Sequence, residues 1–352
     1  MRHLEREGLS PSHVKVITAA AGGPKGLILG PLDRFLFGEW LQGSQAPIDL
    51  VGASIGAWRM ATACLNDGVR AFERLEHDYI HQHYPPEAGR KRPTARQVSD
   101  GFWQGLQAHY GGREAEVITH PRFRLHVMTT RGKGVLNRDG PLRTPVGYTG
   151  AYLTNLLSRR AMGAWLDRVV FSSPAPDLNG VASPLPFDTH DYPSHQVPLS
   201  CDNFMKAVQA SCAIPFLFHA VRDIAGAPAG AYWDGGITDY HLHLDTRGVP
   251  GVVLYPHFQP HVVPGWLDKS LRWRHATSPF LDRVLLLAPS PQWVASLPLG
   301  KLPDRTDFVR YADDVAERVR VWTTAVTAAR QLADEFADWL RRPDLTAVQP
   351  LP

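Results

Sequence analysis

The fold is decided around Ile48-Asp49-Leu50-Val51-Gly52-Ala53-Ser54-Ile55-Gly56, a stretch that residues 57–65 continue with a helical pattern. An apolar run, a Gly-x-Ser-x-Gly turn and helical spacing in succession predict a strand, a sharp turn and a helix. A serine at such a turn is held in a strained backbone conformation, and only small neighbours such as Gly52 and Gly56 allow close approach. The hydroxyl of Ser54 then lies at the start of the helix, where unpaired N–H groups can stabilise an oxyanion. The stretch therefore predicts that Ser54 is a nucleophile.

A second glycine-rich turn, Gly-Gly-Pro-Lys-Gly at residues 22–26, follows the short apolar segment 14–20. That segment predicts the first buried strand of a parallel sheet. The turn can present backbone N–H groups to a developing oxyanion, except at Pro24, which has none. It lacks the Gly-Lys-Ser/Thr ending of a Walker loop and the Gly-x-Gly-x-x-Gly spacing of a dinucleotide site, which argues against a nucleotide. The candidate N–H donors are Gly22, Gly23, Lys25 and Gly26.

A third motif, Tyr232-Trp233-Asp234-Gly235-Gly236, contains a candidate base. An aspartate beside aromatic side chains is partly desolvated, which raises its pKa toward the value that a general base needs. The two glycines that follow permit a tight turn, which can bring the carboxylate of Asp234 against the hydroxyl of Ser54. Taken in isolation, the same residues are more often an ordinary Asp-Gly turn.

The other apolar segments extend this alternation of strands and helices, which predicts a doubly wound α/β layer fold. We expect strands at 14–20, 48–51, 123–130, 249–255 and 283–288, and helices at 27–37, 57–65, 69–79, 102–110, 153–170, 203–212 and 311–341. Segments rich in proline and polar residues predict loops at 84–100 and 171–198. Residues 257–280, which are rich in Trp, Pro, Arg and His, have the character of an insertion.

Composition and charge exclude several classes of protein. Of the 352 residues, 44% are hydrophobic and 20% charged, which is typical of a globular chain. The formal net charge of +3 is too small to argue for nucleic-acid binding. The three cysteines show no Cys-x-x-Cys spacing, which favours reduced thiols over a disulfide framework or a structural zinc site. Neither a secretory signal nor a membrane-spanning stretch is apparent, so we expect a cytoplasmic protein.

Together, the three motifs resemble those of the patatin-like phospholipases. A fourth match is the segment Ala210–Phe216, which resembles the family's Ala-Ser-x-Ala-x-Pro-x-x-Phe pattern, and the matching motifs run in the family's order from residue 14 to 236. The resemblance implies a three-layer α/β/α fold with a mostly parallel central sheet. It also implies a Ser–Asp dyad that needs no histidine, metal or cofactor, with Ser54 as nucleophile and Asp234 as base. The glycine turn would form the oxyanion hole, with Lys25 where the family carries Arg or Lys.

The chain departs from the family at Ala20-Ala21, because the family's turn opens Asp-Gly at this place. An oxyanion hole would be distorted if Ala21 had to adopt a backbone angle reserved for glycine. We expect Gly22 and Gly23 to suffice, but the departure keeps open a non-catalytic lipid-binding protein.

Histidines allow two further interpretations. A Ser–Asp–His triad of the α/β-hydrolase type would use a histidine after Asp234. The candidates are His257, His261 and His275. That fold places several strands before its nucleophile, whereas one precedes 48–51 here, which favours the dyad. His241, His243 and Asp245 would share a metal ion if they lay on a strand, but such spacings are more often structural.

We therefore expect one catalytic domain over residues 1–352, with its core at about 14–290 and the helix 311–341 packed against it. The predicted reaction is hydrolysis of an acyl ester of a phospholipid or another lipid, with transfer of the acyl group to Ser54. The stretch 266–275 within the insertion is either a packed loop or a peripheral contact with anionic lipid. No nucleic-acid partner is expected, and no oligomeric state follows from the sequence. The alternative enzyme is a carboxylesterase or thioesterase for small esters.

Overall fold

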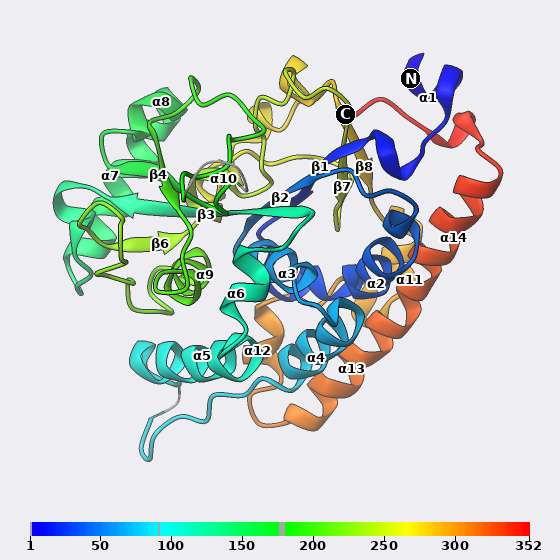
Figure 1. The fold of residues 1–352 in the computed structure, drawn as a ribbon. Coiled ribbons are helices and arrows are strands. Elements are labelled where there is room, and N and C mark those ends of the chain that lie inside the picture. Colours follow the sequence, from blue (N-terminus) through cyan, green and yellow to red (C-terminus); the bar gives the residue numbers. More distant parts are fainter. Residues whose placement is uncertain (1, 91, 176–179) are drawn as a thin grey trace.

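The centre of the computed structural model, which describes residues 2–90, 92–175 and 180–352, is an eight-stranded sheet (Figure 1). The strands are β1 Val14–Ala19, β2 Ile48–Ala53, β3 Phe123–Gly132, β4 Leu166–Ser172, β5 Ser194–Pro198, β6 Tyr232–Asp234, β7 Val252–Pro256 and β8 Val284–Leu287. They follow the order β5-β4-β3-β2-β1-β7-β8, with β6 paired to β3. β1, β2, β3, β7 and β8 run parallel to one another, while β4, β5 and β6 run the opposite way. The predicted mostly parallel sheet is confirmed.

Helices surround the sheet. They are α1 Arg2–Glu7, α2 Gly30–Gly38, α3 Ile55–Ala63, α4 Gly68–His81, α5 Ala95–Tyr110, α6 Glu114–Ile118, α7 Arg143–Leu157, α8 Arg159–Met162, α9 Phe204–Cys212, α10 Gly236–Asp239, α11 Pro291–Ser296, α12 Thr306–Arg310, α13 Val315–Ala328 and α14 Arg330–Arg341. Within the described ranges, no helix has both the length and the apolar character that crossing a bilayer would require.

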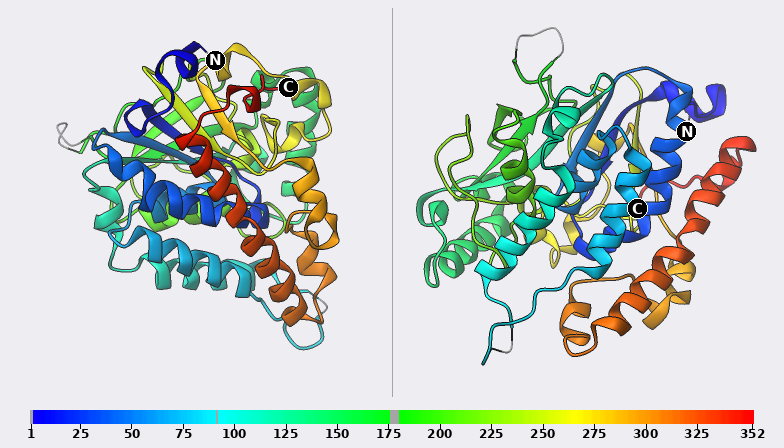
Figure 2. Two further views of the ribbon diagram at one scale, coloured as in Figure 1. Left: turned by 90° about the vertical axis from the view of Figure 1, so that its right-hand side faces the viewer. Right: turned by 60° about the horizontal axis from the view of Figure 1, so that its bottom comes forward.

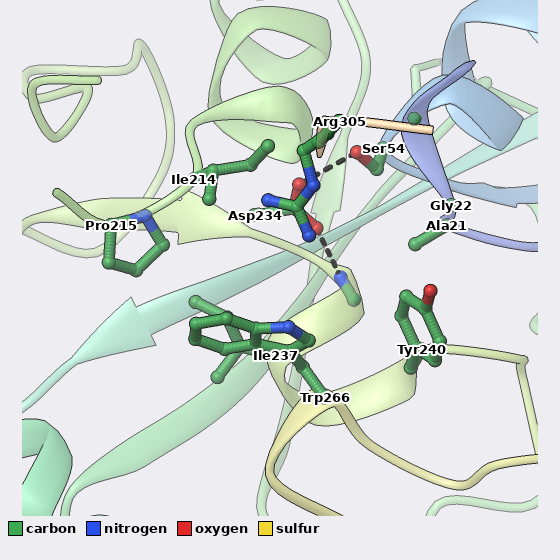
Figure 3. Close-up of a pocket in the computed structure, with 12 residues that line it drawn as sticks. Ala21, Gly22, Ser54, Ile214, Pro215, Asp234, Ile237, Tyr240, Trp266 and Arg305 are labelled. Carbon is green, nitrogen blue, oxygen red and sulfur yellow. Dashed lines mark hydrogen bonds between the residues drawn. The ribbon is translucent and has the colours of Figure 1, made fainter. Parts of the chain in front are cut away.

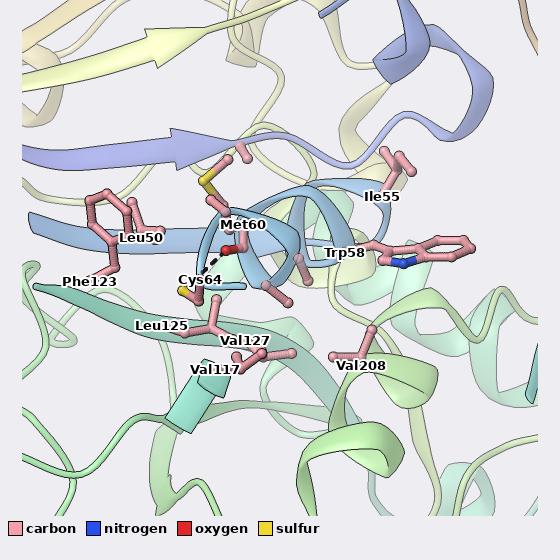
Figure 4. Close-up of a cluster of buried hydrophobic side chains, with 14 of the residues drawn as sticks. Leu50, Ile55, Trp58, Met60, Cys64, Val117, Phe123, Leu125, Val127 and Val208 are labelled. Carbon is pink, nitrogen blue, oxygen red and sulfur yellow. Dashed lines mark hydrogen bonds between the residues drawn. The ribbon is translucent and has the colours of Figure 1, made fainter. Parts of the chain in front are cut away.

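Neighbouring residues of a strand point to opposite sides of the sheet, and in this sheet the residues on both sides are apolar. On one face, Leu50 and Leu125 pack in a cluster with residues of α2, α3, α5 and α9 (Figure 4). On the other face, Val51 and Met128 pack against the chain between residues 240 and 263. α7, α8 and α10 pack in a further cluster with β4 and β6. The result is the predicted three-layer α/β/α fold.

The helix predicted at 153–170 is wrong in its second half. α7 begins earlier, at Arg143, and the segment then passes through the short α8 into strand β4. β4 carries two charged residues, Asp167 and Arg168, which are buried in ion pairs with other elements. The fold thus neutralises both charges inside the protein. The predicted loop 171–198 contains β5, and its residues 176–179 lie outside the described ranges.

The helix predicted at 311–341 is two helices, α13 and α14, which adjoin at Ala329. Figure 2 shows both running along the outside of the helical layer. α13 packs on α4, and α14 packs on α2. Phe336 of α14 lies edge-on to Phe35 and Trp40, with ring centroids 6.4 and 5.7 Å away. α13 and α14 therefore pack on the helical layer that also contains α3, the helix after Ser54.

Candidate active site

Ser54 and Asp234 meet because two strands end against each other on one edge of β3. β2 runs parallel to β3 and ends with Ala53 opposite Met128. β6 runs antiparallel to β3 and ends with Asp234 opposite Thr129, the next residue along. The other edge of β3 is occupied by β4. The residue after β2 and the last residue of β6 are therefore neighbours, although 180 positions separate them in the sequence.

The predicted strand, turn and helix are present around Ser54. β2 ends at Ala53, α3 begins at Ile55, and Ser54 between them has φ 56° and ψ −127°, a conformation that favours glycine. A Cβ at Gly52 would lie 2.5 Å from a backbone nitrogen in the first turn of α3, and a Cβ at Gly56 would overlap the last carbonyl of β1. The close packing of β1, β2 and α3 around the strained serine therefore requires both glycines.

The side chains of Ser54 and Asp234 are joined by a hydrogen bond (Figure 3). The Oγ of Ser54 donates to Oδ2 of Asp234 at 2.7 Å, and the backbone N–H of Gly236 donates to Oδ1 at 2.7 Å. Ser54 is 6% exposed and Asp234 is 7% exposed. The site thus holds an alcohol and a carboxylate in the geometry that transfer of the hydroxyl proton requires.

Burial raises the pKa of Asp234 from its ordinary value to about 6. The hydrogen bonds from Ser54 and Gly236 act in the opposite direction, as do the positive charges of Arg305 and Lys269. A carboxylate with this pKa holds a proton more firmly than an ordinary aspartate, yet it is still mainly ionised at neutral pH. Both properties suit a general base.

A second serine, Ser211 at the end of α9, fixes the backbone of the pair. Its Oγ accepts a hydrogen bond from the N–H of Ser54 at 2.9 Å and donates one to a carbonyl of β3 at 2.7 Å. Close by, the N–H of Asp234 donates to the carbonyl of Ala213 at 2.9 Å. The segment 210–216 was identified in the sequence as a motif match, without a role for Ser211. The available signal was one polar side chain among small apolar ones.

The glycine turn lies beside Ser54, and two of its residues line the same pocket. Gly22 immediately precedes the 3-10 helix Gly23–Leu29, so no helical hydrogen bond uses the N–H groups of these first residues. Gly23 has a φ of 58°, and a Cβ at Gly22 would lie 2.5 Å from the ring of Phe258. Glycine is therefore needed at both positions, and the N–H groups of Gly22 and Gly23 form no hydrogen bond with the residues that the structure describes.

The two other predicted donors, Lys25 and Gly26, are not among the residues that line this pocket. A Cβ at Gly26 would lie 3.1 Å from the side chain of Ile55, so this glycine lets the turn pack on α3. The ammonium of Lys25 lies 5.4 Å from the ring centroid of Phe258, and burial lowers its pKa. The structure thus places Gly22 and Gly23 at the pocket, whereas Lys25 and Gly26 do not line it.

Ala21 does not need a conformation reserved for glycine. In the described part of the chain, the non-glycine residues with positive φ include Ser54 but not Ala21. The N–H of Ala21 donates to the carbonyl of Tyr240 at 2.9 Å, and its side chain is buried. The departure at Ala20-Ala21 therefore brings no backbone strain of that kind.

One cation lines the pocket, and a second basic side chain contacts an aromatic residue of its wall. Arg305, just before α12, lines the pocket (Figure 3), and its positive charge acts on the carboxylate of Asp234 without forming an ion pair with it among the described residues. Lys269 lies 4.0 Å from the ring centroid of Tyr240, and burial together with neighbouring positive charges lowers its pKa to about 7. Neither side chain forms a hydrogen bond or an ion pair with the described residues. The sequence carried no signal for Arg305, which lies outside every matched motif.

The remaining walls of the pocket are apolar or aromatic. They are Ile214, Pro215, Ile237, Tyr240 and Trp266. The three histidines of the triad alternative lie elsewhere: His257 contacts the carbonyl of Gln259, and His261 stacks on His275. No histidine is among the described residues that line this pocket, so the geometry gives a triad no support.

The proposed metal-binding histidines have separate partners. His241 accepts a hydrogen bond from the backbone, His243 contacts the hydroxyl of Ser278, and Asp245 pairs with Arg247. Their segment is not a strand. In the described ranges, no three potential ligands come together as a metal site would require.

Comparisons with known proteins do not assign this chain to a family. No family model matches the chain, and no curated protein matches it. Among solved structures, the crystal structure of VipD from Legionella pneumophila has a TM-score of 0.35 and 14% sequence identity, covering 92% of this chain and 67% of that chain. A likeness at this level carries no argument about function, so the interpretation of the site depends on its own geometry.

Proposed function

We propose that this chain is a lipid acyl hydrolase that uses Ser54 and Asp234 as a catalytic dyad, like the patatin-like phospholipases that its motifs resemble. One observation carries the proposal: a strained serine at a strand–turn–helix junction donates a 2.7 Å hydrogen bond to a buried aspartate. Free N–H groups at Gly22 and Gly23 lie beside the same pocket. Nucleophile, base and oxyanion donors are the three parts that acyl transfer needs.

The reaction would proceed in two steps. Asp234 accepts the proton of Ser54 as Oγ attacks the ester carbonyl carbon, and the N–H groups of Gly22 and Gly23 stabilise the oxyanion that forms. The tetrahedral intermediate collapses to an acyl-serine, and the proton passes from Asp234 to the leaving alcohol. Asp234 then takes a proton from water, the hydroxide attacks the acyl-serine, and the same proton returns to Oγ as the fatty acid leaves.

The substrate class follows from the pocket walls. Apolar and aromatic side chains suit an acyl chain. Arg305 lines the pocket and forms no ion pair with the described residues, so it favours an ester that carries a negative group, such as a phosphate, near the scissile bond. A phospholipid has both parts. A small neutral ester has neither, and we therefore place the carboxylesterase second.

The whole of residues 1–352 is proposed to act as one catalytic domain. The sheet draws strands from Val14 to Leu287, and α13 and α14 pack on α4 and α2 of the layer next to it. A single cooperative unfolding transition, followed by fluorescence and by circular dichroism, tests this. Separate transitions for the part after residue 290 would contradict it.

The dyad is tested with a fluorophosphonate probe that labels activated serines. We expect labelling of the wild-type chain and none of Ser54→Ala or Asp234→Asn, while single replacements of His257 and His275 leave it unchanged. Labelling of Asp234→Asn at the wild-type rate, with loss in one histidine variant, would overturn the dyad. Mass spectrometry of fatty acids released from a panel of phospholipids, neutral lipids and short esters then identifies the substrate.

A further inference from the structure

Helix α7 presents an outer face without charge. From residue 144 to residue 158 the sequence contains no Asp, Glu, Lys or Arg. Its inner face is formed by buried residues at helical spacing, among them Thr144, Tyr148, Ala151 and Asn155. The opposite face carries exposed apolar side chains: Leu142, Val146, Leu153, Leu156 and Leu157. A surface helix of a globular protein ordinarily has charged and polar residues there, so this apolar face of α7 needs a partner.

The inner side of α7 reaches the wall of the candidate active site. The ring of Tyr148 lies 6.1 Å from that of Trp233 and 6.1 Å from that of Phe216, measured between centroids. Trp233 directly precedes Asp234, and Phe216 directly follows Pro215, which lines the pocket. Phe216 is 61% exposed and has a φ of 69°. An exposed aromatic side chain thus links the pocket rim to α7.

A second exposed aromatic residue, Trp273, lies in a segment that contacts the C-terminal half of α7. The hydroxyl of Tyr152 contacts that of Ser270, and the guanidinium of Arg274 donates to the side-chain oxygen of Asn155 at 2.9 Å. These contacts hold the segment that contains Trp273, whose side chain is largely exposed. Of the apolar residues in the predicted lipid contact at 266–275, Leu271 is buried and Trp266 belongs to the pocket wall. Trp273 is therefore the residue of this stretch that can reach lipid.

Exposed arginines lie on α7 and on neighbouring segments that contact it. They are Arg138, Arg143, Arg160 and Arg272. None of their side chains forms a hydrogen bond or an ion pair with the residues that the structure describes. The carboxylates nearby are already engaged, Asp139 by His219 and the buried Asp268 by Arg159. The rim of the face is therefore positive and free to meet an anionic surface.

We infer that the apolar face of α7, with Phe216 and Trp273, lies on a lipid bilayer that contains anionic lipids. Apolar and aromatic side chains at the level of the acyl boundary, with arginines at the level of the phosphates, are what such a surface binds. A protein partner would instead have to bring carboxylates to match four separate arginines. The inference adds an interaction surface to the proposed hydrolysis, and its binding step does not depend on that hydrolysis. Bound in this way, the rim at Phe216 faces the lipid from which the pocket would take its substrate.

The test uses the full chain with Ser54→Ala, so that vesicles are not hydrolysed. Co-sedimentation compares vesicles of phosphatidylcholine alone with vesicles that also contain phosphatidylglycerol. We expect stronger binding to the anionic vesicles and weaker binding as salt rises. Leu153→Asp with Leu157→Asp should lower the partition coefficient by at least about tenfold, since each leucine would lose its transfer to the lipid. These side chains are 56% and 84% exposed, so the fold should persist, which circular dichroism checks.

Matched controls isolate the surface. Val309→Asp makes a similar change at an exposed residue of α12, away from α7 in Figure 1, and should bind normally. Arg160→Gln should reduce the preference for anionic vesicles, whereas Arg330→Gln, at an exposed and unpaired arginine of α14, should not.

Three results would overturn the inference. One is equal binding by the double leucine variant. Another is an equally large loss in the α12 control. The third is a dimer, detected by light scattering, that the double leucine variant dissociates, because a second copy of the chain would then cover the face. Hydrolysis of a soluble ester by the Ser54-containing variants is measured separately, so its absence counts against the proposed function and leaves the vesicle result to decide this inference.

Discussion

Replacement of Asp234 by asparagine should abolish ester hydrolysis and, at pH 8, stabilise the fold. The pKa of Asp234 is raised from 3.8 to about 6, and each pKa unit corresponds to about 1.4 kcal/mol, so the ionised carboxylate costs the folded state about 3 kcal/mol. The cost is absent only below about pH 4, where the carboxyl is protonated in both the folded and the unfolded state. It grows as the pH rises to about 6 and is constant above. Asparagine avoids it and keeps both hydrogen bonds, accepting from Gly236 and donating to Ser54.

Urea unfolding at pH 8 and at pH 4 measures the effect, which should reach about 3 kcal/mol at the higher pH and nearly vanish at the lower. The kcat/KM of the wild-type chain for a soluble ester should fall as the pH drops below about 6, because the base is then protonated. Asp239→Asn is the matched control. Burial alone would raise the pKa of Asp239, but the charge of the buried Arg168 and its two hydrogen bonds lower it. Loss of this buried ion pair in Asp239→Asn should therefore destabilise the fold by about 3–5 kcal/mol. The reasoning fails if Asp234→Asn gains no stability at pH 8 or still hydrolyses the ester.

Three further variants probe the surroundings of the dyad. Ser211→Ala leaves a buried N–H without an acceptor, so it should cost about 1–3 kcal/mol in urea unfolding and lower kcat, and unchanged values for both would remove its positioning role. Arg305→Gln removes a positive charge that lowers the pKa of Asp234, so it should move the acid limb of the kcat/KM profile to higher pH and reduce the preference for anionic esters. Arg310→Gln, on the exposed side of α12, is the control and should do neither. Identical profiles for both variants would contradict this. Gly56→Ala should prevent stable folding because its Cβ overlaps a carbonyl, whereas Gly105→Ala, whose Cβ meets nothing, should gain about 0.5–1 kcal/mol in thermal unfolding; a folded Gly56 variant would refute the packing argument.

The fold class and the turn at Ser54 were predictable because they depend on local signals. Apolar runs of strand length and glycines at fixed spacing are visible in any short window. The part of α7 before residue 153 was not predicted, although a helix was expected from residue 153 onward. A helix whose outer face lacks charge shows no contrast between apolar and polar positions, so its 3.6-residue period is hidden. β4 was missed for the opposite reason, since Asp167 and Arg168 look exposed until Arg131 and Asp239 are brought to them.

The residues of the candidate site also differ in whether a local sequence signal could identify them. Ser54 and Asp234 were identified through motifs, and the structure brings their side chains into contact, though their catalytic role remains a proposal. Gly22 and Gly23 lie at the pocket, while Lys25 and Gly26 do not line it. Arg305 could not be found, because its place depends on how the end of the chain packs on the helical layer.

Because β2 and β6 meet end to end on β3, a partly synthesised chain lacks one half of the Ser54–Asp234 pair. The serine, its strained turn and the glycine loop all leave the ribosome early, whereas the carboxylate arrives only with the strand that ends at residue 234. Until that strand docks, the alcohol has no partner to take its proton. Under the proposed function, hydrolysis would therefore begin only after the strand that carries residue 234 has been made and has paired with β3.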